Sequence, residues 1–121
     1  MDLDVGIDPT SAVPPYEQLR SAVAARVADG RLPAGTKLPT VRALASDLGL
    51  AVNTVAKTYR SLESDGVVET RGRAGTFVAS DALAAPPEAL AAHAADYARH
   101  ARRAGLTLPE AEALLQRSWD A

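Results

Sequence analysis

Between residues 41 and 62, apolar side chains recur at helical spacing in two short runs with a glycine between them. The first run has apolar residues at i, i+3, i+4 and i+7, which share one face of a helix. They are Val41, Leu44, Ala45 and Leu48. The second run carries an apolar stripe made of Val52, Val55, Tyr59 and Leu62. This pattern predicts two amphipathic helices joined by a tight turn.

The ends of these helices are marked by their residue types. Thr40 can cap the first helix, because a hydroxyl accepts a hydrogen bond from an unpaired backbone N–H. Gly49 is expected to end that helix in the left-handed conformation. Ala51 precedes the second helix without a polar side chain, which costs its start about 1 kcal/mol of capping. Neither helix can bury its stripe alone, so we expect a helix-turn-helix, whose second helix enters the DNA major groove.

The polar face of the second helix carries Asn53, Thr54, Lys57 and Arg60. Asn53 can pair with a base edge, Thr54 with a phosphate or a thymine methyl group, and Lys57 with a phosphate or a guanine. Arg60 can equally face solvent. The alternative interpretation is an ordinary pair of helices in a small helical domain, with solvated polar faces.

The stretch after this helix predicts a β-hairpin. Residues 67–69 begin an extended run, residues 71–75 form a glycine-rich turn, and residues 76–78 run back. A hairpin in this place is the wing of a winged helix, where glycine allows close approach to DNA and arginine meets phosphate. The residues expected to do so are Arg71, Gly72, Arg73 and Gly75.

The residues before residue 41 are expected to complete the domain. Residues 1–12 are predicted to be extended or frayed. A helix from Pro14 or Pro15 to about Asp29 is expected to pack behind the helix-turn-helix. Residues 32–39 form a turn and a short extended piece that can pair with the wing. The predicted fold is mainly α with a small β-wing.

The C-terminal residues predict a separate helical segment. Residues 81–87 read as a linker, followed by helices over residues 88–103 and 111–119, the second preceded by a capping box. Two helices of this length are expected neither to enclose a ligand pocket of several hundred Å3 nor to form their own core. Their apolar stripes are therefore expected to pair with a second copy. The predicted domains are a DNA-binding domain, residues 1–80, and a dimerisation segment, residues 81–121.

Composition narrows the function. The chain has 121 residues, no cysteine and a net charge of −2, yet residues 31–79 carry seven Lys or Arg against four Asp or Glu. Local positive charge favours contact with nucleic acid. No apolar run reaches membrane-spanning length, so a cytoplasmic protein is expected. No metal site, cofactor or catalytic set is predicted; His93, Asp96 and His100 share a helix face that is better explained as solvated.

Four segments together resemble the DNA-binding domain of the GntR family of bacterial transcription regulators, over residues 14–78. They are PPYEQLRSAV, GRLPAGTKLPTVRALASDLGL, NTVAKTYRSLESDGVV and GRAGTFV. The NTVAKTY run and the short C-terminal tail resemble the YtrA subfamily. The resemblance implies that Arg42 contacts DNA and that the protein controls a neighbouring transporter operon. Val52 departs from the family, whose members often have arginine there.

The sequence therefore predicts a sequence-specific regulator that binds double-stranded DNA, a homodimeric repressor on an inverted-repeat operator. The alternative is a winged-helix module that binds a protein partner without binding DNA. Acidic residues on the reading face would favour that alternative, but the face carries amide, hydroxyl and cationic groups. No particular small-molecule effector follows from the residues. The predicted DNA-contacting residues are Thr40, Arg42, Asn53, Thr54, Lys57, Arg71, Gly72, Arg73 and Gly75.

Overall fold

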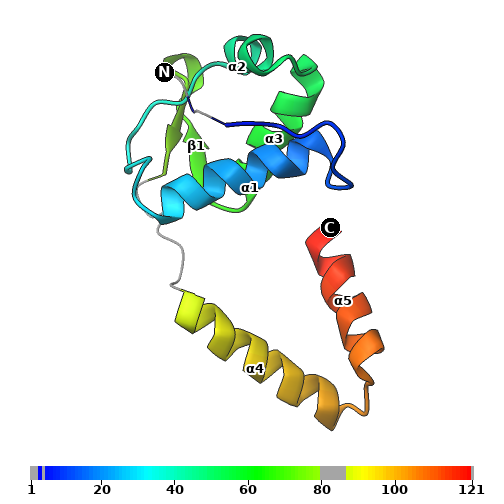
Figure 1. The fold of residues 1–121 in the computed structure, drawn as a ribbon. Coiled ribbons are helices and arrows are strands. Elements are labelled where there is room, and N and C mark those ends of the chain that lie inside the picture. Colours follow the sequence, from blue (N-terminus) through cyan, green and yellow to red (C-terminus); the bar gives the residue numbers. More distant parts are fainter. Residues whose placement is uncertain (1–2, 4, 80–86, 121) are drawn as a thin grey trace. The chain divides into compact units, whose positions relative to one another are not determined.

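The computed structural model describes residue 3, residues 5–79 and residues 87–120 of the chain. The chain divides into two compact units, residues 1–84 and residues 85–121 (Figure 1). The predicted linker, residues 81–87, lies outside the described residues except for Pro87 at the start of a helix.

The N-terminal unit is a three-helix bundle with a two-stranded wing (Figure 1). Its elements are α1 (Pro15–Ala28), α2 (Val41–Leu48), α3 (Val52–Ser64), β1 (Val68–Thr70), a 3-10 turn η1 (Gly72–Ala74) and β2 (Thr76–Val78). The strands are antiparallel, with Val68 opposite Val78, and Lys37 adds a single bridge to Phe77. The predicted fold, mainly α with a small wing, is confirmed, and the predicted third strand is reduced to that bridge.

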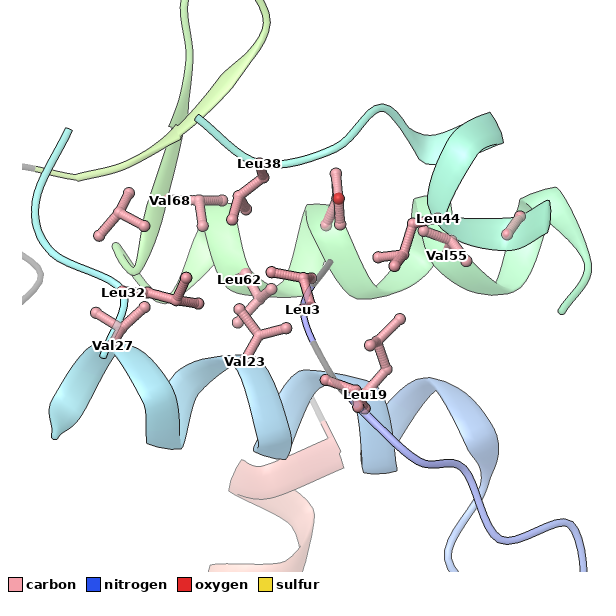
Figure 2. Packing of buried hydrophobic residues seen from close by; sticks show 14 residues of the cluster. Leu3, Leu19, Val23, Val27, Leu32, Leu38, Leu44, Val55, Leu62 and Val68 are labelled. Atoms are coloured by element: carbon pink, nitrogen blue, oxygen red, sulfur yellow. The ribbon is translucent and has the colours of Figure 1, made fainter. Parts of the chain in front are cut away.

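The core lies between α1 and α3. Leu19 and Val23 of α1 and Val55 and Leu62 of α3 are completely buried, and their side chains point toward one another in Figure 2. Each such side chain contributes about 1.5–3 kcal/mol by leaving water. The core is closed by residues outside α1 and α3, namely Leu32, Leu38, Leu44, Val68 and Val78.

The predicted helix ends of the helix-turn-helix are confirmed. The Thr40 hydroxyl accepts a hydrogen bond from the Ala43 backbone N–H at 3.1 Å, and α2 begins at the next residue. Gly49 follows α2 with φ of 67°, the left-handed conformation that glycine adopts without a Cβ clash. Ala51 gives α3 no side-chain cap. The sharp turn between α2 and α3 therefore depends on Gly49.

Of the two states predicted for the N-terminal segment, extended or frayed, residue 3 and residues 5–7 adopt the extended one and pack on the core. Leu3 is 4% exposed and Val5 9%, and both belong to the hydrophobic core. With Ile7 they form an alternating apolar pattern, which places all three on one side of an extended chain. The Gln18 side chain of α1 accepts a hydrogen bond from the Asp8 N–H at 2.8 Å and donates to the Asp8 carbonyl at 2.9 Å. These bonds fix the segment beside α1.

The apolar stripe of α3 also differs from the prediction at its first residue. Val52 is 47% exposed, so it is not part of the buried stripe. Val52 begins the helix and lies at the end of the stripe. The buried face instead includes Thr58, which is 0% exposed.

The C-terminal unit consists of α4 (Pro87–Arg103) and α5 (Leu108–Asp120). The predicted capping box at the start of α5 is confirmed, since the Thr107 N–H donates to Glu110 Oε1 at 3.0 Å and the Glu110 N–H donates to Thr107 Oγ1 at 3.4 Å. The Tyr97 hydroxyl donates to the Ala111 carbonyl at 2.6 Å, joining the two helices. None of the described helices is long and apolar enough to cross a membrane.

An open apolar groove of about 510 Å3 lies between α4 and α5. The prediction was that two such helices do not enclose a ligand pocket of several hundred Å3, and this groove is open to solvent rather than enclosed. The groove arises because the buried contacts are small alanines, Ala101 and Ala111, while Leu106 and Leu115 line its walls. Several large apolar side chains of this unit are exposed, namely Leu90, Leu108, Leu114, Leu115 and Trp119.

Candidate nucleic-acid interface

The exposed face of α3 carries the residues that sequence reasoning assigned to base reading. Asn53 and Lys57 are exposed and Thr54 is partly buried, while Val55 and Leu62 are completely buried. Residues four apart on a helix project from the same face. Asn53 and Lys57 therefore project together from the side of α3 that does not pack on the core, and Arg60 is exposed as well.

Two side chains of α3 hold the helix to the rest of the unit. The Thr58 hydroxyl donates to the Tyr16 carbonyl of α1 at 2.9 Å, and the Tyr59 hydroxyl donates to the Pro39 carbonyl at 2.6 Å. Burial raises the pKa of Tyr59 to about 12. The sequence reading missed the anchoring role of Thr58, although its position three residues after Val55 placed it beside the buried stripe. These bonds fix how α3 presents its polar face.

Lys57 also contacts α1. Its Nζ lies 3.8 Å from the centroid of the Tyr16 ring, a cation–π contact. The helical period predicted that Lys57 lies on the polar face of the helix and points outward from the core. The structure keeps it exposed but places its ammonium over an aromatic face.

The start of α2 carries Thr40 and Arg42. The Thr40 oxygen accepts the capping hydrogen bond, which leaves its hydroxyl hydrogen available to a phosphate oxygen. Arg42 is exposed in the first turn of the helix. Within the described residues, it forms no ion pair or hydrogen bond. Its charge is therefore available to an external anion.

The wing tip presents its two arginines differently. Arg71 Nη2 lies 2.6 Å from Glu69 Oε1, and its guanidinium lies over the Phe77 ring at 4.3 Å. Arg73 is exposed and has no ion pair within the part of the chain that the structure describes. The wing therefore offers one arginine whose charge is partly offset by a carboxylate and one whose charge is not.

The glycines of the tip have the backbone conformations that the turn requires. Gly72 has φ of 53° and Gly75 has φ of 115°, both in the region that residues with a Cβ rarely adopt. The Arg71 N–H donates to the Gly75 carbonyl at 2.8 Å and closes the turn. A Cβ at Gly75 would lie 3.0 Å from Cε of Lys37. The narrow tip therefore depends on both glycines.

Together, a helix-turn-helix with an exposed polar recognition face and a basic hairpin after it define a winged helix-turn-helix DNA-binding domain. The family model described as "Bacterial regulatory proteins, gntR family" matches residues 15–78. This match covers more than half of the chain, which belongs to the GntR family. The family model describes its members as bacterial regulatory proteins.

Two similar proteins show which members of the family the chain resembles. HTH-type transcriptional regulator Rv1152 of Mycobacterium tuberculosis is 49% identical over 105 residues, covering 87% of this chain and 85% of that protein. HTH-type transcriptional repressor YtrA of Bacillus subtilis is 42% identical over 79 residues, covering 64% of this chain and 60% of the repressor. The resemblance to YtrA is thereby confirmed.

A solved structure shows a similar domain on DNA. AraR(DBD) in complex with operator ORX1 aligns with a TM-score of 0.54 at 28% identity, covering 60% of this chain and 89% of that one.

Proposed function

We propose that the protein is a sequence-specific transcription regulator that acts as a homodimeric repressor in the cytoplasm and binds an inverted-repeat operator. The observation that carries this proposal is the exposed face of α3, where Asn53 and Lys57 project together from a helix anchored by Thr58 and Tyr59. Membership of the GntR family and the similarity to a repressor and to an operator-bound domain support it.

In this proposal α3 enters the major groove. Asn53 pairs with a base edge, Thr54 contacts a phosphate or a thymine methyl group, and Lys57 binds a guanine or a flanking phosphate. Thr40 and Arg42 bind the phosphate backbone from the start of α2. The two kinds of contact have different roles: phosphate contacts set the register of the protein on the DNA, and base contacts give sequence specificity.

The wing supplies a second set of contacts. Arg73 binds phosphate or the minor groove with its full charge, and Arg71 does so after exchanging its ion pair with Glu69 for a phosphate. Gly72 and Gly75 keep the tip narrow, so that its backbone can approach DNA closely.

The C-terminal helices form the dimer in this proposal. The apolar groove between α4 and α5 and the exposed side chains of Leu108, Leu115 and Trp119 are large for a monomer surface of this small unit. A second copy of the same helices covers them in a two-fold arrangement. A dimer places two α3 helices on DNA, which is why an inverted repeat is expected.

The test is a fluorescence-anisotropy titration of the full chain at several salt concentrations. The probes are a duplex that the wild-type protein selects from a randomised pool and an unselected duplex. We expect tighter binding to the selected duplex and, for Arg73→Ala, weaker binding to both with a salt slope shallower by roughly one unit. Arg99→Ala is the charge-matched control, since Arg99 lies on α4 and pairs with Asp96. Binding to neither duplex would favour the protein-partner alternative.

A further inference from the structure

The first turn of α1 contacts two consecutive residues of α3 through a single residue, Tyr16. The Tyr16 carbonyl accepts a hydrogen bond from the Thr58 hydroxyl at 2.9 Å, and the Tyr16 ring lies 3.8 Å from Lys57 Nζ. Thr58 is completely buried, so this bond fixes the backbone of α3 relative to α1 at this point. The ring then acts on the neighbouring side chain, which is exposed.

A contact with an aromatic face differs from an ion pair because it does not neutralise the charge of the cation. The ring attracts the ammonium through its quadrupole. It adds no negative charge in doing so, and the ammonium hydrogens directed away from the ring remain available to other acceptors. The wing shows the opposite case, because Glu69 accepts two N–H groups of Arg71 and offsets its charge. Tyr16 can therefore hold Lys57 without neutralising it or adding a negative charge that repels DNA.

Holding a lysine in place matters for binding. The side chain has many rotamers, and restricting them when a ligand binds costs conformational entropy. A ring that restricts the ammonium before DNA arrives reduces that cost. Lys57 also lies one turn after Asn53 on the same face, so its placement bears directly on the reading surface.

We propose that Tyr16 is a positioning residue for DNA recognition, whose ring holds the charged Lys57 ammonium ready for the DNA. This role rests on the proposed function, in which Lys57 contacts DNA. Tyr16 acts through Lys57, and its hydroxyl is not required.

The binding test is a double-mutant cycle in the full chain, using the duplex selected by the wild-type protein. Tyr16→Leu removes the ring and leaves the backbone carbonyl that Thr58 uses. It should weaken binding about two- to fivefold, the range expected of an exposed cation–π contact. Tyr16→Phe keeps the ring and should bind like wild type. In a Lys57→Ala background, Tyr16→Leu should have no further effect.

A second measurement reports the contact without DNA. The Tyr16 ring current should shift the Lys57 ε-methylene protons upfield in the NMR spectrum. The shift should persist in Tyr16→Phe and disappear in Tyr16→Leu. Thermal midpoints check folding, and Tyr16→Met replaces Tyr16→Leu if the latter unfolds.

Three results would overturn the role of Tyr16. One is equal weakening by Tyr16→Leu with and without Lys57, and another is an unshifted Lys57 resonance in the wild type. The third is weakening by Tyr16→Phe as large as that by Tyr16→Leu, which would assign the effect to the hydroxyl. A wild-type protein that selects no duplex would overturn the proposed function itself, and is thus distinguishable from these three.

Discussion

Glu69 Oε1 lies 2.6 Å from Arg71 Nη2, so the wing of this GntR-family protein carries its own counter-ion for one of its two tip arginines. Glu69 lies in β1 and Arg71 directly follows the strand, and side chains two residues apart on an extended chain share one face. Any phosphate that binds Arg71 must compete with this carboxylate. Arg73 faces no such competition within the described residues.

Glu69→Gln should therefore tighten binding to DNA of any sequence. The substitution frees Arg71 and removes a negative charge beside the phosphates, so the gain should be several-fold at low salt and shrink as salt rises. Folding stability should change by less than about 1 kcal/mol, the usual worth of an exposed ion pair. Anisotropy titrations with selected and unselected duplexes measure the effect. Unchanged affinity for both duplexes would show that Arg71 does not approach the DNA backbone.

Tyr59→Phe should change how stability depends on pH. The Tyr59 pKa is raised to about 12 by burial, above its ordinary value of 10.0, so folding favours the neutral phenol. That contribution is complete below about pH 10 and is lost as pH rises toward 12. Chemical unfolding at a series of alkaline pH values should show a steeper loss for wild type than for Tyr59→Phe. Parallel curves would contradict the burial of this hydroxyl.

The same substitution should lower stability at neutral pH. It leaves the Pro39 carbonyl without the hydrogen bond that the Tyr59 hydroxyl donates, and the loss of such a part-buried bond costs about 0.5–1.5 kcal/mol. Because the bond ties α3 to the segment before α2, its loss should also weaken binding to the selected duplex.

Leu3→Ala should destabilise the winged-helix unit. Leu3 is 4% exposed and lies in the core, and truncating a buried leucine costs about 2–5 kcal/mol. Val13→Ala is the matched control, because Val13 is 44% exposed in the same N-terminal region and should cost little. Thermal unfolding compares the two variants. Equal midpoints would show that the N-terminal segment does not pack on the core in solution.

The sequence predicted those parts of the fold that depend on local chemistry. Thr40 as a cap and Gly49 as a left-handed stop are set by their own side chains, and the capping box at Thr107 follows from two residues three apart. The packing of Leu3 and Val5 was missed because a short alternating pattern is weak beside the polar residues around it. The exposure of Val52 was missed because periodicity gives the direction of a side chain and not where the core ends.

The candidate site likewise has features that local sequence predicts and features that it does not. The helical period of α3 was enough to place Asn53 and Lys57 on its outer face. The contact of Lys57 with Tyr16 joins residues distant in sequence and depends on how α1 crosses α3, which no local pattern specifies. The pairing of Glu69 with Arg71 could have been predicted from the alternation of side chains along an extended chain, because residues two apart lie on the same face.

Leu115→Glu should disrupt the proposed dimer. Leu115 lines the groove of the C-terminal unit and is 54% exposed, so a charge there would be buried without a partner when a second copy docks. Sedimentation at micromolar concentration should show a wild-type dimer and a monomeric variant. Gln116→Glu introduces the same charge at a neighbouring exposed position and should remain dimeric. A Leu115→Glu protein that is still dimeric would place the interface elsewhere.

Asn53→Ala tests most directly whether α3 recognises DNA sequence, because this change removes the amide that would contact a base edge without altering charge. The measurement is the affinity of the full chain for selected and unselected duplexes, with Ser64→Ala as a control at the far end of α3. We predict a loss of about 1–3 kcal/mol on the selected duplex, none on the unselected duplex, and an unchanged thermal midpoint. An unchanged affinity for the selected duplex, or an equal loss on both duplexes, would contradict sequence reading by α3.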